Sequence, residues 1–273
     1  QRQMCIRDRQ GESESRSLIE TWHGKGRNRY VITPRFAISC STEQLIAAGR
    51  LHEQYPGTYI QTHLSENKDE INSTLSLYPD CQDYLEVYGR AGLVTDRSVF
   101  GHCIHLSDSE CRRLAEAGSV IAHCPTSNLF LGSGLFDMQQ ANRVGMQTVL
   151  ATDIGAGTSF SMLRTMGEAY KVQQLGGYPM SVFESLYKCT LGAAKALHLD
   201  DEIGCFGKGR KADFIVIDYA VTPSQQVRMD YLKHHEKWTL ENKLFGLQTI
   251  GDDRNILATY IVGRRMKLSL IHI

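Results

Sequence analysis

A histidine and a glutamate three residues apart, His63 and Glu66, follow a short apolar run in the segment Gln-Thr-His-Leu-Ser-Glu. If the histidine ends a β-strand and the glutamate opens the next turn, both side chains can point into one cavity. This pairing suits a metal ligand beside a carboxylate that transfers protons. An isolated His-x-x-Glu occurs often by chance, so its meaning depends on what the rest of the chain places near it.

Five short runs of apolar, mostly β-branched residues end in a polar or titratable side chain. The runs are residues 30–36, 58–63, 98–102, 119–123 and 147–153, and their ends carry Arg35, His63, His102, His123 and Asp153. Histidine nitrogens and carboxylate oxygens form a ligand set that zinc or iron accepts. Any one such histidine is more often a hydrogen-bonded structural residue, but their common position at run ends favours one shared site.

Helical patterns between these runs indicate how the chain positions them. Residues 41–54 carry apolar side chains at helical spacing, and Ser107 with Glu110 forms a capping-box pattern. Short strands alternating with helices predict a parallel sheet covered on both faces. An open doubly wound sheet and a (β/α)8 barrel both fit this α/β pattern. We favour the barrel, because reactive groups from several strands converge at its C-terminal face, whereas an open sheet concentrates its site at one switch point.

The chain changes character after residue 199. Helices are expected at residues 159–174 and 181–197, followed by a glycine-punctuated loop, a strand at 212–218 and a β-hairpin at 256–266. The later part therefore indicates a small C-terminal β-rich subdomain. The predicted domains are residues 15–198 for the barrel part and 199–266 for the subdomain, with 1–14 non-native or disordered and 267–273 a non-native tail.

Composition excludes several classes of protein. The 273 residues carry a formal net charge of zero, with 42% hydrophobic and 22% charged residues, so bulk charge gives no reason to expect a nucleic-acid or membrane partner. No apolar run approaches the roughly 20 residues of a membrane span. Eight cysteines are scattered without a Cys-x-x-Cys pair, which favours reduced thiols and a cytoplasmic location over a disulfide framework or zinc ribbon.

The residues at the run ends fit metal-assisted hydrolysis at a planar or carbonyl carbon. A metal ion lowers the pKa of bound water from near 16 to about 7. Glu66 can take a proton from that water and return it to the leaving group, while Asp153 binds the metal. His102 can support the oxyanion, and Arg35 can hold a carbonyl or an anionic edge of the substrate.

Several histidines and cysteines keep simpler interpretations. His123 can contact substrate or merely bond to the backbone, and both interpretations stay open. Cys103 and Cys124 each follow a candidate histidine, but neighbouring residues of a strand point to opposite faces, so we expect both thiols to pack against outer helices. We assign His52, His105 and His198 to the surface or the core.

Four motifs carry a resemblance to a known family. They are Thr-Pro-Arg-Phe-Ala-Ile-Ser-Cys at 33–40, Gln-Thr-His-Leu-Ser-Glu-Asn at 61–67, Ala-His-Cys-Pro-Thr-Ser-Asn at 122–128 and Gly-Asp-Asp-Arg-Asn at 251–255. Over about residues 15–266 the chain resembles the amidohydrolase superfamily and, within it, the guanine deaminases. The resemblance implies a zinc-bearing (β/α)8 barrel, of which this chain would form about strands 4 to 8, and a β-sandwich built from both chain ends.

The resemblance also implies roles for individual residues. His63 and Asp153 would bind one zinc ion per subunit, and Glu66, His102 and Asp153 would be catalytic. Guanine would be the substrate, converted hydrolytically to xanthine and ammonia by attack of water at C2. The resemblance also implies a homodimer. The residues expected to contact the purine are Arg35, Phe36, His63, Glu66 and Asp153.

The chain departs from the family pattern at one point. The family has a His-x-His pair after its first barrel strand, and no such pair precedes residue 30 here. About three strands and part of the sandwich would then be absent. We therefore expect the full-length protein to be active and this isolated chain to be inactive.

Two other functions remain as alternatives. One is a related amidohydrolase acting on another heterocycle, such as an adenosine-type nucleoside or a triazine, which Arg35, Phe36 and the loop after Asp153 disfavour. The other is a non-catalytic scaffold of the same fold. Glu66 and Asp153 count against a scaffold, because it has no use for a buried acid beside a ligand histidine.

Overall fold

The computed structural model describes residues 2–266 of the chain, and their side chains from residue 10 onward. The chain divides into two compact units, which are described separately. The first contains the chain up to His123 together with residues 132–147. The second contains residues 124–131 and the chain from Thr148 onward. The predicted domain boundary at residue 199 stays a prediction.

A five-stranded sheet, in the order β1-β2-β3-β4-β5, carries the run ends identified in the sequence. Its strands are β1 Val31–Ile32, β2 Tyr59–Leu64, β3 Ser98–His102, β4 Val120–His123 and β5 Gln147–Leu150. Pairing from β1 to β4 is parallel, with Leu64 opposite His102 and Phe100 opposite Ile121. Leu64, Phe100 and Ile121 are fully buried, as a sheet covered on both faces requires. The predicted α/β class with a partial barrel is confirmed.

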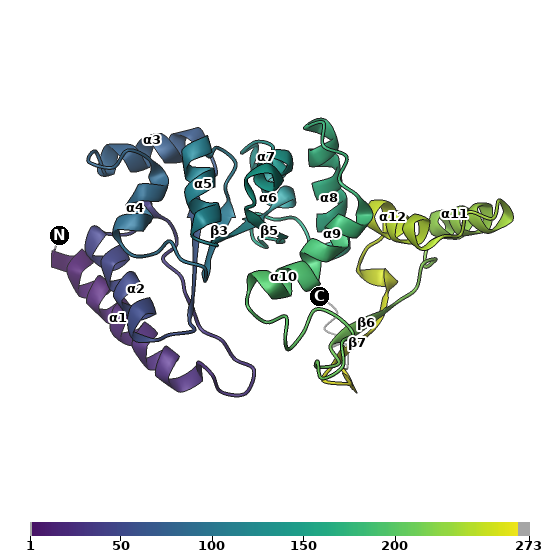
Figure 1. The fold of residues 1–273 in the computed structure, drawn as a ribbon, viewed down its shortest axis with the longest axis horizontal. Coiled ribbons are helices and arrows are strands. Elements are labelled where there is room, and N and C mark those ends of the chain that lie inside the picture. The colour runs from purple at the N-terminus through teal and green to yellow at the C-terminus, as the bar shows by residue number, and fades with distance from the viewer. Residues whose placement is uncertain (1, 267–273) are drawn as a thin grey trace. The chain divides into compact units, whose positions relative to one another are not determined.

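In the first unit, one helix precedes β1 and the other helices lie between strands along the chain (Figure 1). They are α1 Arg2–Trp22, α2 Thr42–Gln54, α3 Lys68–Leu77, α4 Tyr84–Arg90, α5 Asp108–Glu116 and α7 Met138–Val144, with a short 3-10 turn at Ala37–Ser39. The predicted capping box of Ser107 and Glu110 starts α5, and an equivalent box of Asn67 and Glu70 starts α3. Both glutamates are buried, so each helix begins at a fixed point just after a strand.

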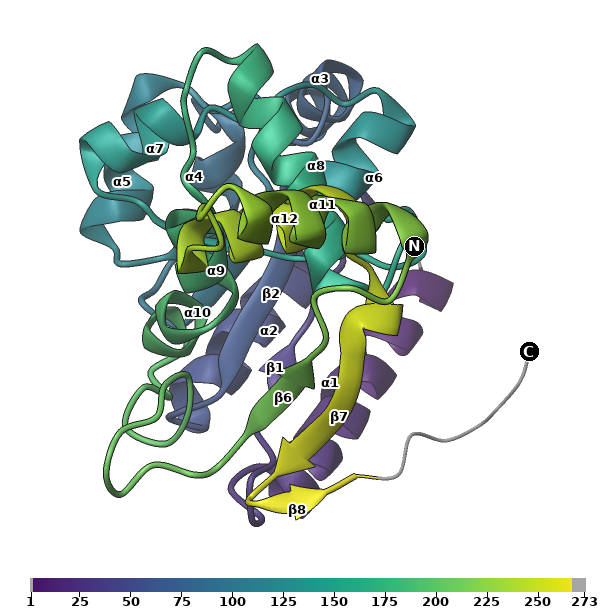
Figure 2. The ribbon, with the colours of Figure 1, turned by 90° about the vertical axis from the view of Figure 1, so that its right-hand side faces the viewer.

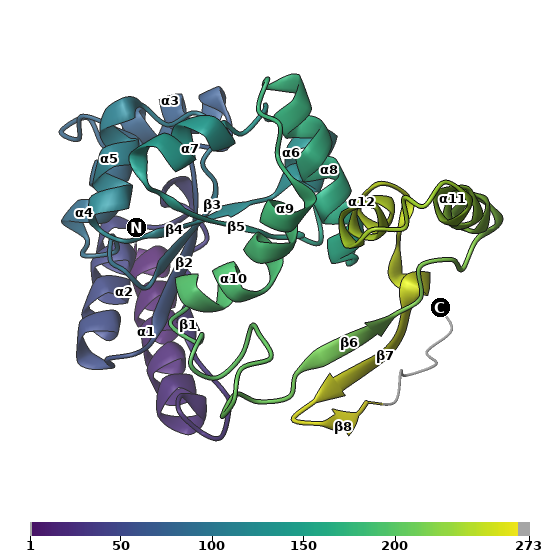
Figure 3. The ribbon, with the colours of Figure 1, turned by 45° about the vertical axis from the view of Figure 1, so that its right-hand side comes forward.

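The second unit contains helices and an antiparallel sheet. Its helices are α6 Pro125–Leu131, α8 Met162–Leu175, α9 Val182–Cys189, α10 Leu191–Ala196, α11 Pro223–His234 and α12 Leu240–Ile250, with a 3-10 turn at Asp253–Asn255. Strands β6 Phe214–Ile217, β7 Ile256–Ile261 and β8 Arg264–Arg265 form the sheet that Figure 2 shows. In Figure 3, β6 and β7 run side by side, and the predicted hairpin is the β7–β8 pair.

Some elements differ from the sequence expectation. The helix expected at 181–197 breaks at Thr190, whose φ of −128° and ψ of −106° are not helical. Residues 199–266 contain the antiparallel sheet and, in addition, two helices, α11 and α12, that were not predicted from the sequence. The start of α11 has a clear sequence signal, since Thr222, Pro223 and Gln225 form a capping box with proline in the first turn.

Within residues 2–266, none of the helices combines the length and hydrophobicity that a membrane span requires. The seven cysteines whose side chains the structure describes are free thiols.

Candidate metal centre and active site

His63 lies near the end of β2 with its ring orientation fixed by a backbone carbonyl. Its Nδ1 is 2.7 Å from the carbonyl oxygen of Arg35, and its backbone N–H donates to the same oxygen at 3.1 Å. A carbonyl oxygen can only accept, so Nδ1 carries the proton and Nε2 of the neutral ring keeps a lone pair. A histidine held in this way is suited to bind a metal through Nε2.

His102 closes β3 beside His63. The two rings stack with centroids 5.1 Å apart, and Nδ1 of His102 lies 3.8 Å from Oε1 of Glu66. The ring is almost completely buried. His102 also has a φ of 70°, a conformation that is uncommon for a non-glycine residue and occurs preferentially at functional sites.

Glu66 follows β2 and is held at both its side chain and its backbone. Ser133 donates a hydrogen bond from its hydroxyl to Oε1 of Glu66 at 3.1 Å, while the backbone N–H of Glu66 donates to Glu70 at 2.9 Å. The carbonyl of Ser133 in turn contacts Nε2 of His105 at 2.9 Å. Ser133 was not among the residues predicted from the sequence. Its signal is the Gly-Ser-Gly segment at 132–134, where both glycines have positive φ and turn the chain back.

Arg35 and Phe36 form the side of the site next to β1. The guanidinium carbon of Arg35 lies 5.2 Å from the centre of the Phe36 ring, a cation–π distance. The Phe36 ring is 5.6 Å from that of His63. The structure therefore brings together five of the six predicted site residues within the first unit: Arg35, Phe36, His63, Glu66 and His102. Their individual roles stay predictions.

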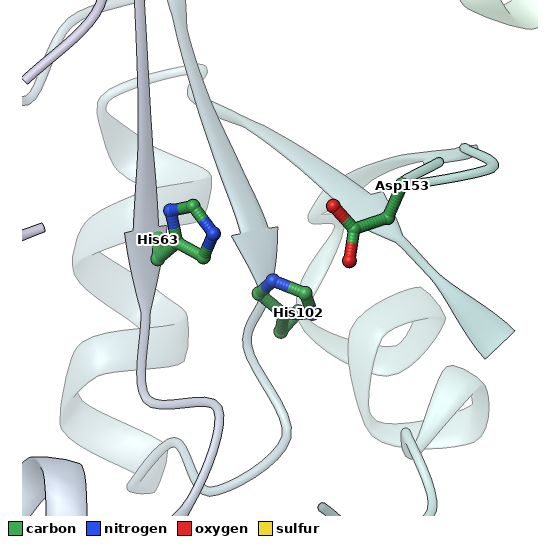
Figure 4. Close-up of side chains that lie close together, drawn as sticks. All are labelled: His63, His102 and Asp153. Carbon is green, nitrogen blue, oxygen red and sulfur yellow. The ribbon is translucent and has the colours of Figure 1, made fainter. Parts of the chain in front are cut away.

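Asp153, the sixth predicted residue, belongs to the second unit and lies in the loop after β5, with a φ of 47°. His63, His102 and Asp153 are the group that, among the described residues, could hold a metal ion. Figure 4 shows from which strand ends these side chains come. Two imidazoles and a carboxylate are donors that suit zinc, and the lone pair left on Nε2 of His63 fits that use. The group includes His102, which the sequence analysis assigned to oxyanion support.

The remaining candidates are buried. His123 is fully buried and stacks on Phe136 with centroids 4.8 Å apart. Cys103 and Cys124 are also buried, which agrees with the expectation of packing thiols. The strand argument behind that expectation does not apply to Cys103, however, because β3 ends at His102 and Cys103 has a φ of 54°.

Comparison with known proteins decides the family. The sequence model of the amidohydrolase family matches residues 7–266. The chain belongs to this family. This amidohydrolase chain is 52% identical over 251 residues to the guanine deaminase of Escherichia coli strain K12, covering 92% of the chain and 56% of that protein.

Solved structures agree with this assignment. A structure of E. coli guanine deaminase matches with a TM-score of 0.91 and 50% identity, covering 95% of this chain and 60% of that one. A guanine deaminase from C. acetobutylicum with guanine bound in its active site matches with a TM-score of 0.80 and 31% identity, over 93% and 59% of the two chains. The chain thus spans about half the length of the curated relatives it matches.

Proposed function

We propose that the protein to which this chain belongs is a zinc-dependent guanine deaminase, which converts guanine and water to xanthine and ammonia. One observation carries the proposal. This chain is 52% identical to E. coli guanine deaminase. At the ends of adjacent strands it carries the Arg35–Phe36 pair, His63 with Nε2 available, and Glu66, which is hydrogen-bonded to Ser133. The relative with guanine bound supports guanine as the ligand.

We propose His63, through Nε2, and Asp153 as ligands of one zinc ion per subunit. When bound, zinc supplies the Lewis acidity that makes water a nucleophile near neutral pH. The bond from Nδ1 of His63 to the Arg35 carbonyl holds the ring in the tautomer that a ligand needs. His102 stacks on His63. We propose that it stabilises the negative charge that develops when water attacks C2.

Glu66 is the proposed proton carrier. It takes a proton from the attacking water and delivers it to the exocyclic nitrogen at C2, which leaves as ammonia. The Ser133 hydroxyl donates to Oε1 of Glu66, and the His102 ring lies 3.8 Å from the same oxygen. These contacts restrict the position of the carboxylate, so that the same group can take the proton from water and give it to the leaving nitrogen.

Arg35 and Phe36 are the proposed purine contacts. A guanidinium is always charged and donates along a planar edge, which suits the carbonyl and ring nitrogens of guanine. The Phe36 ring offers an apolar face for the purine, and the guanidinium over that ring is held in place by the cation–π contact.

We further propose a cytoplasmic location and a homodimer. The free thiols of the described cysteines support the first. The second rests on the resemblance to guanine deaminases.

The test is a substrate panel on the protein in the longest form that its gene encodes, loaded with zinc. Guanine, adenosine and a triazine are offered separately, and ammonia release is measured. We expect turnover of guanine, and a loss of at least 100-fold in kcat when Glu66→Gln removes the proton carrier while leaving zinc content unchanged. Turnover of adenosine or the triazine without turnover of guanine would overturn the proposal, and a folded, zinc-free, inactive protein would identify a scaffold.

A further inference from the structure

Tyr88, a fully buried tyrosine of α4, places its hydroxyl among main-chain groups of the candidate site. The hydroxyl donates to the carbonyl oxygen of His63 at 2.8 Å and accepts from the backbone N–H of Ala37 at 3.0 Å. The Thr62 hydroxyl lies 3.1 Å from it and 3.2 Å from the Arg35 carbonyl. The Tyr88 hydroxyl therefore links the backbone of Ala37, next to Phe36, to the backbone of His63 by hydrogen bonds.

Two of the groups that contact the Tyr88 hydroxyl lie where water cannot replace a lost partner. Ala37 and Thr62 are buried, so an N–H or hydroxyl there that loses its partner cannot turn to bulk water. An aromatic residue needed only for packing could be a phenylalanine, which would remove the bonds to Ala37 and to the His63 carbonyl and leave the Thr62 hydroxyl with its contact to the Arg35 carbonyl.

A second buried tyrosine extends the connection to Glu66. Tyr84 stacks on Tyr88 with ring centroids 5.4 Å apart, and its hydroxyl donates to Oε1 of Glu70 at 2.8 Å. The other oxygen of Glu70 accepts from the backbone N–H of Glu66 at 2.9 Å. Tyr84 and Glu70 are both buried, so this carboxylate is held by protein donors on two sides.

Helix α4 is itself fixed to the turn that follows β3. The backbone N–H of Leu85 lies 3.4 Å from Oε1 of Glu110, whose other oxygen accepts from the N–H and hydroxyl of Ser107, each at 2.8 Å. Glu110 and Glu70 are thus capping-box glutamates on the helices after β3 and β2, and both reach α4. These two glutamates therefore fix the position of α4 relative to the ends of β2 and β3.

We propose that Tyr88 is a positioning residue, which fixes the backbone of Phe36–Ala37 relative to His63, and that Tyr84 with Glu70 does the same for Glu66. The inference rests on the proposed function for the roles of Phe36, His63 and Glu66. A tyrosine hydroxyl that sets both a purine contact and a zinc ligand acts on turnover through geometry, since displacement of a reacting group by about 1 Å can cost about 100-fold in rate.

The test compares Tyr88→Phe with Tyr78→Phe in the full-length protein. Tyr78 is a half-buried tyrosine of the same unit whose hydroxyl contacts Thr42 and, at 3.4 Å, the Cys40 carbonyl, and none of the proposed site residues. Three quantities are measured for each variant: amide exchange at Ala37 by NMR, zinc affinity by calorimetry, and kcat and KM for guanine. A circular-dichroism melt establishes that each variant is folded.

For Tyr88→Phe we expect at least tenfold faster exchange of the Ala37 amide, zinc binding weakened about tenfold, and kcat lowered between 10-fold and 100-fold, with Tyr78→Phe unchanged in all three. Tyr84→Phe is the second variant, and should speed exchange at Glu66. Unchanged exchange at Ala37, or faster exchange with unchanged zinc affinity and kcat, would overturn the positioning role.

The two proposals fail separately. If the parent protein does not turn over guanine but zinc affinity still falls in Tyr88→Phe and not in Tyr78→Phe, the proposed function is wrong and the positioning role stands. If the parent turns over guanine and Tyr88→Phe matches it in kcat and zinc affinity, the reverse holds.

Discussion

Substituting Gln225 by alanine should destabilise the second unit far more than the same change at its neighbour Gln226. Gln225 is buried at the start of α11, and its side-chain oxygen accepts from the N–H groups of Val221 at 2.9 Å and Thr222 at 3.2 Å. Its side-chain nitrogen donates to the Ile250 carbonyl at 2.9 Å and to Oδ1 of Asn255 at 3.0 Å. The side-chain oxygen also accepts from Nδ2 of Asn255 at 3.2 Å, so the change removes five contacts and leaves a small cavity.

The magnitude follows from which groups lose a partner. Val221 and Thr222 are partly accessible, so losing this side of the capping box costs about 1 kcal/mol. Asn255 is fully buried and keeps its bonds to the Asp218 carbonyl and the Asp252 N–H, but loses its partners on Gln225, which adds about 2 kcal/mol. We expect a total near 3 kcal/mol.

Gln226 is the matched control because it is the next residue on the same helix. Its side chain is exposed and bonds only across one helical turn to Asp230 at 2.9 Å, a contact of about 0.2–0.5 kcal/mol. Urea unfolding is followed by fluorescence of Trp238, in a Trp22→Phe background so that only the second unit reports. Equal midpoints for Gln225→Ala and Gln226→Ala, at equal slopes, would refute this account of the amide network.

Three further outcomes are expected from substitutions elsewhere. Gly49→Ala should lower the melting temperature because its Cβ would lie 1.9 Å from a backbone carbonyl oxygen, whereas Gly89→Ala, in a helix with nothing within 4 Å, should raise stability by about 0.5–1 kcal/mol; calorimetry distinguishes the signs. Hydrogen bonds from Arg254 hold the pKa of Asp252 below its usual range, so its stabilising contribution is complete above the unfolded pKa of about 3.9 and is lost as pH falls through the lower folded value. Asp252→Asn should therefore lower the melting temperature at pH 7, with a difference that shrinks below about pH 4, and a constant difference down to pH 3 would contradict this. His63→Ala should weaken zinc binding at least tenfold by calorimetry, and unchanged affinity would exclude it as a ligand.

The sequence predicts the sheet well because each strand is short, apolar and bounded by polar residues. Ser98–His102 is found with the expected bounds, and the Ser107 capping box is found where expected. The first strand is shorter than residues 30–36 because the chain leaves the ladder after Ile32, and Pro34 has no N–H to donate.

Helices α11 and α12 were not predicted from the sequence pattern. The segment around α11 and α12 lies between two strands of one antiparallel sheet, so a sheet-like composition on both sides suggested a β-rich subdomain. The Gly-Asp-Asp-Arg-Asn motif at 251–255 was used only as a mark of resemblance. In the structure its Asn255 contacts Gln225 at the start of α11 and donates to the Asp218 carbonyl just after β6, which is a structural reason for an amide at that position. Gln225 in turn donates to the Ile250 carbonyl at the end of α12.

The candidate site shows a different limit. Residue types at strand ends predict which side chains come together, but not what orients them. His63 is oriented by the main-chain carbonyl of Arg35, the Phe36 segment by a tyrosine 51 residues away in sequence from Ala37, and Glu66 by a serine 67 residues further along the chain. Main-chain partners leave no side-chain signature, and buried tyrosines are typical of packing.

Backbone conformation adds a last element that residue types cannot report. Ser65 directly follows β2, and His102 is the last residue of the neighbouring strand β3. Both have a positive φ, 50° for Ser65 and 70° for His102. Each such residue turns the chain sharply as it leaves the sheet, so the next side chain does not continue the alternation of the strand. This is why the alternation argument places Cys103 correctly in the core but for a reason that does not hold there. It is also why Glu66, one residue past Ser65, can lie beside His102, which a straight continuation of β2 would not allow.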